Sequence, residues 1–77
     1  MFVYVIYSEN KSKRYIGHTS DLQMRLKMHN AGRVKSTKAG VPWRIISIKE
    51  YASRSEARWV ERSLKCSKEK LNKFLSL

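Results

Sequence analysis

Two short runs of aromatic and β-branched residues near the N-terminus constrain the fold more than any other part of the chain. The first run is Phe2–Tyr7, the second is Arg14–Gly17, and a polar turn joins them. Residues of these kinds favour strands, and the composition of the turn favours a hairpin. Because side chains alternate between the two faces of a strand, Tyr4 and Tyr15 share a face if Tyr4 pairs with Tyr15 or with Gly17. A register that slips by one residue would send the two tyrosines to opposite faces.

A helix is expected to follow the hairpin. Ser20 is its predicted N-cap, Asp21 suits the positive end of the helix dipole, and the helix runs to about Asn30. Arg25 borders the buried stripe of this helix, one turn before His29. A charged residue at that place is unusual for a plain amphipathic helix, so the sequence suggests a functional site where the helix meets the sheet.

The second half of the chain is expected to contain a loop, a third strand and two further helices. Arg33–Pro42 combines basic and hydroxyl side chains with two turn-forming residues, so we expect a mobile loop that attracts phosphate. Trp43–Tyr51 is the predicted third strand, and its apolar residues do not alternate, as expected of a strand that is covered on both faces. A capping box at Ser53–Glu56 starts the second long helix, and a last helix runs from Lys68 to about Leu75. The order β-β-α-β-α-α predicts a small α+β domain.

The composition narrows the function. The 77 residues leave room for one domain, 1–77, and 17 Lys and Arg against 6 Asp and Glu give a net charge of +11. Such a charge attracts polyanions, so nucleic acid is the expected partner, although a solvated basic surface or a structural ribonucleoprotein would also carry it. Cys66 is the single cysteine, which excludes an internal disulfide and a cysteine-rich zinc site. The longest apolar run is too short to cross a membrane and lacks the features of a signal peptide, so we expect a soluble cytoplasmic protein.

Four segments together resemble the GIY-YIG nuclease superfamily. Tyr15–Gly17 is the second half of the motif that names the family, and Phe2–Tyr4 is similar to the first half, with Phe2 in place of the glycine. Asp21–Asn30 is similar to the family's arginine helix, and Ser55–Lys65 is similar to its glutamate helix. The resemblance is greatest to small single-domain members, with the nuclease domain of the excision-repair subunit UvrC a more distant relative. It implies a three-stranded antiparallel sheet flanked by helices, and metal-dependent hydrolysis of phosphodiester bonds in DNA repair or recombination.

The resemblance also implies roles for individual residues. Tyr4 is the candidate general base, and Tyr15 is a partner that positions water or phosphate. Arg25 would stabilise the charged phosphate in the transition state, and His29 matches a histidine found one turn after the arginine in part of the family. Glu61 would hold a single divalent cation, either Mg²⁺ or another ion such as Mn²⁺.

For three further residues the sequence leaves the role open. His18 stands where the repair-type relatives carry lysine, and Asn72 is a candidate for an asparagine that recurs late in the family. Trp59 points away from the buried stripe of its helix, so it could stack on a base or pack against the last helix.

The chemistry of these residue types is compatible with hydrolysis of a phosphodiester. A tyrosine has an unperturbed pKa of about 10, so Tyr4 needs a nearby positive charge, from Arg25 or from a metal ion, to lower it. A guanidinium binds two phosphoryl oxygens at once, and Mg²⁺ keeps most of its waters, so that one carboxylate is enough to hold it. The alternative is structural: the tyrosines are ordinary strand residues, Arg25 is solvated, His29 is a core histidine and Glu61 is only an ion-pair partner of Lys65.

Phosphate contacts are expected from four basic residues in the middle of the chain, namely Arg33, Lys35, Lys38 and Arg44. The sequence shows no element suited to reading base edges, so the expected activity is that of a structure- or single-strand-directed DNA endonuclease with little sequence specificity. RNA is the alternative substrate. The alternative function is a nucleic-acid-binding module that keeps the fold but does not cleave.

Overall fold

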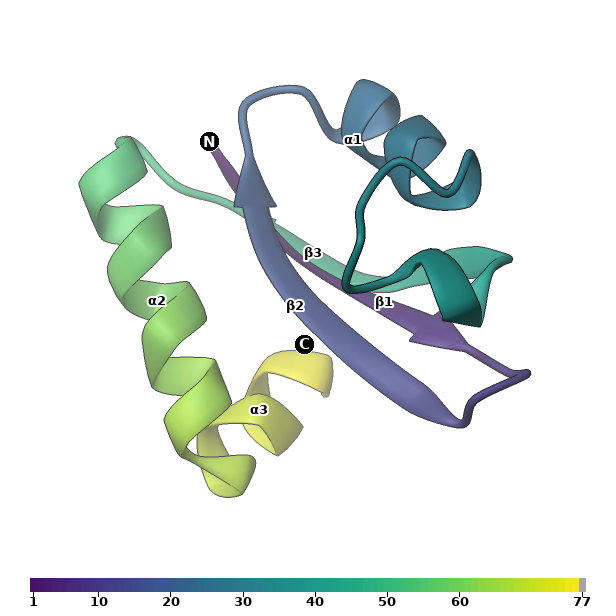
Figure 1. Cartoon of the computed structure of the whole chain (residues 1–77). Coiled ribbons are helices and arrows are strands. Elements are labelled where there is room, and N and C mark those ends of the chain that lie inside the picture. Colours follow the sequence, from purple (N-terminus) through teal and green to yellow (C-terminus); the bar gives the residue numbers. More distant parts are fainter. Residues whose placement is uncertain (77) are drawn as a thin grey trace.

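The structure is a computed structural model that describes residues 1–76, and in this part of the chain three strands and three helices follow one another as the sequence predicts. The elements are β1 (Phe2–Ser8), β2 (Lys13–Thr19), α1 (Leu22–Asn30), a 3₁₀ turn (Lys38–Gly40), β3 (Trp43–Glu50), α2 (Arg54–Cys66) and α3 (Lys68–Leu75) (Figure 1). The expected α+β class and the order β-β-α-β-α-α are therefore confirmed.

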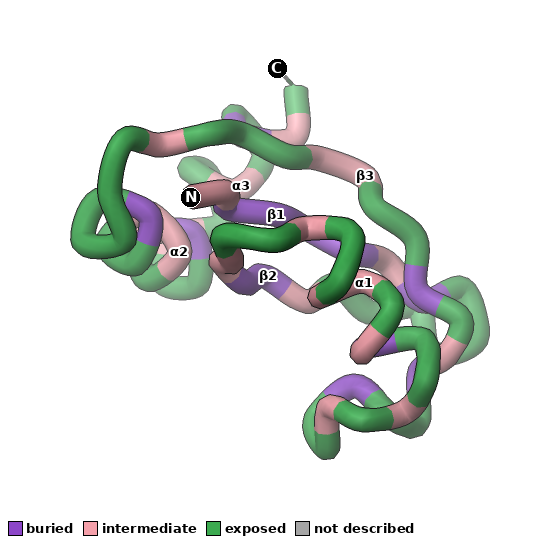
Figure 2. Tube along the Cα trace, turned by 90° about the horizontal axis from the view of Figure 1, so that it is seen from above, coloured by how far each residue is buried: buried purple, intermediate pink, exposed green. Residues whose placement is uncertain are grey.

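The sheet has the strand order β2-β1-β3, and both strand pairs are antiparallel. In the hairpin, Tyr4 lies opposite Gly17 and Ile6 lies opposite Tyr15. Tyr4 and Tyr15 are therefore diagonal neighbours on one face, as one of the two expected registers requires. The central position of β1 makes it the most buried strand of the sheet, as Figure 2 shows.

The third strand differs from its expected environment. β3 is an edge strand, and Ile45 and Ile48 are 36% and 48% exposed. The expectation that β3 is covered on both faces was therefore wrong. A register shift between Val5 and Ile6, where β1 pairs with β3, accounts for the irregular pattern, since such an irregularity interrupts the regular pairing of the two strands.

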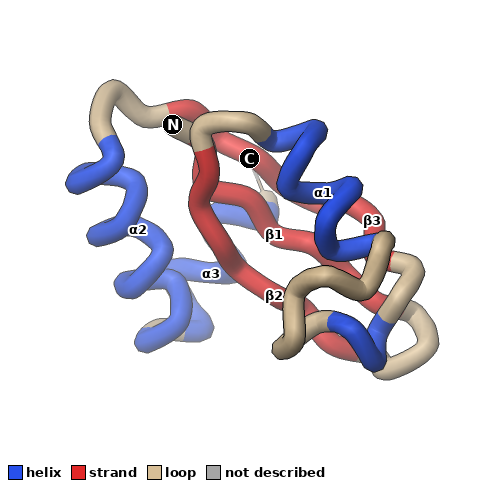
Figure 3. The backbone as a smooth tube through the Cα atoms, turned by 45° about the horizontal axis from the view of Figure 1, so that its top comes forward, coloured by secondary structure: helices blue, strands red, loops and turns tan. Residues whose placement is uncertain are grey.

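The two faces of the sheet carry separate apolar clusters. Helices α2 and α3 cover one face and α1 covers the other, with the sheet between them (Figure 3). The buried members of the α2–α3 cluster are Val3, Val5, Ile16, Ala57, Leu64 and Phe74. The buried members of the α1 cluster are Tyr4, Ile6 and Trp43, with Tyr15, Leu22, Leu26 and Val41 packed against them.

Side-chain caps fix where the helices begin. Asp21, rather than the expected Ser20, caps α1, because its carboxylate accepts the backbone N–H of Met24 at 3.0 Å. Ser53 caps α2 as predicted and accepts the N–H of Glu56 at 3.2 Å. The Glu56 carboxylate accepts the N–H of Ala52 at 3.2 Å, one residue before the position that a regular capping box uses.

None of the helices in residues 1–76 is long and apolar enough to cross a bilayer. Cys66, the one cysteine of the sequence, is exposed at the end of α2.

Candidate active site

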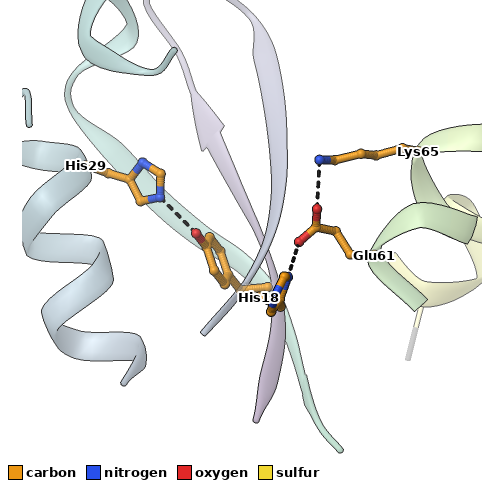
Figure 4. Close-up of polar contacts among 5 residues, drawn as sticks. His18, His29, Glu61 and Lys65 are labelled. Carbon is orange, nitrogen blue, oxygen red and sulfur yellow. Dashed lines mark hydrogen bonds and ion pairs between the residues drawn. The ribbon is translucent and has the colours of Figure 1, made fainter. Parts of the chain in front are cut away.

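A chain of hydrogen bonds runs from the sheet through α1 into the loop that follows it. The Tyr4 hydroxyl lies 2.9 Å from His29 Nε2, the contact marked at His29 in Figure 4. His29 Nδ1 in turn lies 2.8 Å from Thr37 Oγ1. All three side chains are buried, with at most 2% of each residue exposed. The three residues come from β1, α1 and the loop before the 3₁₀ turn, so the contact depends on the fold and not on local sequence.

The hydrogen-bond partners also indicate which atom is the donor in each of these bonds. The Thr37 hydroxyl donates to the carbonyl of Val34 at 3.3 Å, so its oxygen is left to accept the Nδ1–H of His29. His29 Nε2 then carries a lone pair and accepts the hydroxyl proton of Tyr4. In this arrangement Tyr4 is a donor to a neutral imidazole.

The pKa values agree with this assignment. Burial, together with the charge of Arg25, lowers the pKa of His29 to about 4, so the imidazole is neutral at pH 7. Burial raises the pKa of Tyr4 above its usual value, and the opposing effect of Arg25 is smaller. Arg25 by itself therefore does not lower the Tyr4 pKa below its usual value, because desolvation outweighs its positive charge. Tyr4 is a neutral phenol whose proton has a neutral acceptor beside it.

Arg25 and Tyr15 join this group, as the sequence predicts. The half-buried Arg25 guanidinium interacts with the hydroxyl of Tyr4, which raises the pKa of Arg25 further, and it also interacts with Tyr15. The Tyr15 ring meets the His29 ring edge-on, with 5.1 Å between the centroids. Four of the expected site residues, Tyr4, Tyr15, Arg25 and His29, therefore lie together on the α1 face of the sheet.

Gly17 leaves the space that the Tyr4 ring occupies. A Cβ atom at Gly17 would lie 2.5 Å from the Tyr4 hydroxyl oxygen and 2.6 Å from the ring carbon that bears it. Any side chain at this position would displace Tyr4, which cannot move freely because it is 1% exposed. The glycine of the Tyr-Ile-Gly segment is therefore required by close contact.

Glu61 forms a second polar group on α2. Its carboxylate accepts His18 Nδ1–H on one oxygen at 2.6 Å and the Lys65 ammonium on the other at 2.8 Å (Figure 4). Burial raises the pKa of the Glu61 carboxyl, but the hydrogen bonds from Lys65 and His18 outweigh burial, and the net pKa is lowered. Glu61 is therefore ionised at neutral pH, and His18, which the sequence left open, contacts it directly.

The two groups approach each other at the free edge of β2. Gly17 and Tyr15 face α1, whereas His18 faces α2, because consecutive strand residues alternate. Lys65 links the sides, since its ammonium bonds Glu61 and also lies 5.9 Å from the centroid of the Tyr15 ring. The charge of Glu61 contributes to the raised pKa of Tyr4. Glu61 therefore lies on the helix that covers the opposite face, and Lys65 is the side chain that connects it with Tyr15.

The residues around Glu61 offer few metal ligands. Within residues 1–76 there is no group of three or more His, Cys, Asp or Glu side chains that could hold a metal ion. Mg²⁺ retains several waters and accepts one carboxylate ligand, so Glu61 fits a mostly hydrated divalent ion. Such an ion would compete with Lys65 and His18 for the Glu61 oxygens.

Other expected residues lie apart from the site. Asn72 is exposed on α3, where it lines a surface hollow together with Tyr7 and Arg14. These residues lie on the side of the sheet away from Tyr4, since Tyr7 alternates with Tyr4 and Ile6 along β1. Trp59 is 66% exposed and has the Lys70 ammonium 5.8 Å from its ring.

The four basic residues expected to bind phosphate are all exposed on the surface. Arg44 pairs with Glu9 at 3.4 Å, and Arg33, Lys35 and Lys38 lie along the loop after α1. The loop is also attached to the core, because the Trp43 indole N–H donates to the Thr37 carbonyl at 2.7 Å. The expectation of a mobile loop therefore does not describe the segment around Thr37.

Sequence reasoning missed Thr37 as a site residue, and it treated Lys65 only as an ion-pair partner. No local signal identifies Thr37, since its role depends on a contact with His29. For Lys65 the spacing of four residues from Glu61 predicts the ion pair but not its position over Tyr15.

Comparison with known proteins assigns the chain to a family. The sequence profile of the GIY-YIG catalytic domain matches residues 1–74. A UPF0213 protein of Streptococcus pneumoniae serotype 4 is 38% identical over 68 residues, which cover 87% of this chain and 68% of the relative. A UPF0213 protein of Listeria innocua serovar 6a is 36% identical over 77 residues, covering 97% of this chain and 84% of the relative. No solved structure gives a significant match. With a profile match over residues 1–74 and relatives that are 36% and 38% identical, the chain belongs to the GIY-YIG catalytic domain family.

Proposed function

We propose that the protein is a metal-dependent endonuclease that hydrolyses phosphodiester bonds of DNA with little sequence specificity. The observation that supports this most directly is the buried Tyr4–His29 hydrogen bond with Arg25 beside it, in a chain of the GIY-YIG family. We take residues 1–77 as one catalytic domain acting in the cytoplasm, in DNA repair or recombination.

Arg25 is the proposed ligand of the scissile phosphate. Attack on a phosphodiester increases the negative charge on its non-bridging oxygens, and a guanidinium can donate to two of them at once. Arg25 is half-buried and stays charged, since its interaction with Tyr4 raises its pKa. Lysine would supply the charge at this position but not the paired donors.

Tyr4 and His29 are the proposed proton acceptors. In this proposal the attacking water transfers a proton to the Tyr4 oxygen while Tyr4 transfers its own proton to His29 Nε2. The water oxygen forms its bond to phosphorus, the bond to the leaving oxygen breaks, and the leaving oxygen takes a proton from solvent. The raised pKa of Tyr4 does not prevent this step, because the phenol is never required to exist as a free phenolate. The pKa of about 4 at His29 means that its protonated form is short-lived and passes the proton on to solvent at neutral pH.

Glu61 is the proposed metal ligand. A divalent ion bound there would supply positive charge for the leaving oxygen and its phosphate. His18 and Lys65 keep the carboxylate ionised and oriented by hydrogen bonds to both of its oxygens.

The test is cleavage of supercoiled, branched and single-stranded DNA by the purified protein, with Mg²⁺ or with EDTA. Arg25→Ala and Glu61→Gln should each reduce the rate by about a hundredfold or more. Arg58→Ala, at an exposed position of α2, is the control for Arg25, and Glu69→Gln is the control for Glu61 because it also removes the acid of an i,i+4 pair with lysine. Cleavage that survives both site variants would overturn the proposed site.

A non-cleaving nucleic-acid-binding module is the second candidate. One observation favours it: both oxygens of Glu61 are already bonded to protein donors. Binding of DNA or RNA without metal-dependent cleavage, unchanged by Glu61→Gln, would support the module over the enzyme.

A further inference from the structure

A basic pocket lies beside Tyr15, on the α1 face of the sheet. It has a volume of about 240 Å³ and is formed by the hairpin turn on one side and by the loop around the 3₁₀ turn on the other. The residues that line it include Lys11, Lys13, Tyr15, Ser36, Ala39 and Trp43. Tyr15 also meets His29 edge-on at 5.1 Å, so the pocket adjoins the proposed catalytic group.

One wall of this pocket is held rigidly. Trp43 is only 7% exposed, and its indole N–H donates to the carbonyl of Thr37 at 2.7 Å. Gly40 packs so closely that a Cβ atom there would lie 2.5 Å from the Trp43 ring. The wall formed by Trp43, Thr37 and Gly40 is therefore preformed and does not need a ligand to order it.

The open side of the pocket is positively charged. Lys11 and Lys13 are exposed, and within residues 1–76 neither has a carboxylate within 4 Å, unlike Lys65 and Arg44. No acidic residue is among the residues that line the pocket. Unpaired ammonium groups around a cavity favour an anionic ligand, and a nucleic acid offers phosphates.

The size of the pocket limits what can enter. Its volume of about 240 Å³ is below the ~300–1,000 Å³ of typical small-ligand pockets, so one compact group fits and a stack of bases does not. Bases in a duplex are stacked and paired, whereas those of a single strand or a frayed end can turn outward. The pocket therefore suits a nucleotide that has left its stack.

We propose that this pocket is a substrate subsite that binds one unstacked nucleotide, adjacent to the scissile phosphate, through Lys11 and Lys13 and through contact with the side chains of Tyr15, Ala39 and Trp43. The subsite rests on the proposed nuclease function, and it makes single-stranded or frayed nucleic acid the preferred substrate. It also places a phosphate contact at the hairpin turn, outside the four basic residues that the sequence indicated.

The experiment measures the binding of a fluorescent ten-nucleotide oligothymidine and of a blunt DNA duplex by fluorescence anisotropy, in EDTA so that cleavage plays no part. Ser36→Phe fills the pocket without changing charge, and it should weaken single-strand binding about tenfold while leaving duplex binding within about twofold. Lys11→Gln with Lys13→Gln should weaken single-strand binding by about tenfold or more. Lys68→Gln with Lys70→Gln is the matched control, since these exposed lysines lie on α3, over the other face of the sheet.

The outcomes separate the subsite from diffuse charge attraction. An equal loss for the two lysine pairs, or an equal effect of Ser36→Phe on single strand and duplex, would overturn the subsite. If Ser36→Phe does not fold, as judged by circular dichroism, the comparison of the two lysine pairs still tests whether the subsite exists. A protein that cleaves nothing but shows the expected binding pattern would refute the proposed function and leave the subsite in place.

Discussion

At the scale of single residues, the candidate site depends on where one proton lies. Tyr4 donates to His29, His29 donates to Thr37, and Thr37 donates to the carbonyl of Val34. A buried imidazole can hold its proton on either nitrogen, and only one of the two tautomers leaves Nε2 free to accept from Tyr4. Thr37 selects that tautomer, so we assign it as a positioning residue that acts through His29.

Thr37→Val removes the acceptor of the His29 proton while keeping the shape of the side chain. We expect cleavage to slow by about tenfold or more, since the acceptor nitrogen is no longer defined, and we expect a loss of about 1–3 kcal/mol of stability from the unpaired N–H. Thr37→Ser keeps the hydroxyl, so it should retain most of the cleavage rate and most of the stability. Nitrogen NMR of the imidazole would show the tautomer directly. Equal activity of the valine and serine variants would contradict the assignment.

His29 makes stability depend on pH. In the unfolded chain its pKa is about 6.5, and in the folded protein the pKa is about 4, so below pH 6.5 the unfolded state binds the proton first. The contribution of His29 is therefore complete above pH 6.5 and is lost as the pH falls to about 4, to a total of about 3 kcal/mol. Urea unfolding across this range measures it. His29→Gln should remove this part of the pH dependence, and an unchanged dependence would show that another group is responsible.

Gly17→Ala tests the close contact with Tyr4. The methyl group would overlap the Tyr4 hydroxyl, so we expect a loss of about 1–3 kcal/mol in the free energy of unfolding, together with loss of cleavage. Gly32→Ala is the control, because Gly32 has φ +73° and a Cβ there would meet only the Lys38 side chain, at 3.6 Å. The control should lose about 1 kcal/mol through backbone strain and keep its activity. Full activity of Gly17→Ala would show that Tyr4 can move without cost.

At the scale of secondary structure elements, the helices that bear the site are positioned by the sheet. β1 carries Tyr4 on one face and Val3 and Val5 on the other, so it connects the α1 cluster with the α2–α3 cluster. The edge strand β2 brings Tyr15 and His18 to its two sides. Glu61 lies in the second turn of α2, well inside a helix whose start is set by Ser53.

Ser53→Ala removes the cap of α2 and should cost about 1 kcal/mol of stability, since one backbone N–H at the helix start loses its acceptor. Ser55→Ala, in the exposed first turn of the same helix, is the control and should have little effect. Urea unfolding compares the two. Cleavage at 25 °C should be unchanged in both, because Glu61 keeps its bonds to His18 and Lys65. A loss of activity in Ser53→Ala alone would mean that the helix end sets the position of Glu61.

At the scale of the molecule as a whole, the dominant property is the net charge of +11 on 77 residues. Each phosphate that a basic side chain contacts on single-stranded DNA releases counterions, with a slope of about −0.7 in log K against log salt. We therefore expect the affinity for oligothymidine to fall by about tenfold or more between 50 and 200 mM salt. Anisotropy titrations at several salt concentrations measure the slope. An affinity that does not change with salt would refute the electrostatic binding that the proposal assumes.

Much of the fold could be predicted from local patterns. The sequence predicted the hairpin but left the partner of Tyr4 open between Tyr15 and Gly17. Ser53 marked the start of α2, and the spacing of Arg25 and His29 placed both on the side of α1 that meets the sheet. The wrong predictions concerned features that depend on contacts with other segments of the chain. The irregular pattern of β3 reflected its interrupted pairing with β1 at an exposed edge, and Asp21 competed successfully with Ser20 for the cap of α1.

The amino-acid sequence alone was sufficient for the order of the elements, the excess of positive charge and the list of residues with suitable chemistry, because propensity, periodicity and capping act over a few neighbouring positions. How those residues act together depended on the tertiary structure. Burial raised the pKa of Tyr4 against the charge of Arg25, and contacts between distant segments joined His29 to Thr37 and Glu61 to His18. Desolvation and non-local hydrogen bonds exist only once the chain has packed, so no local pattern could have revealed them.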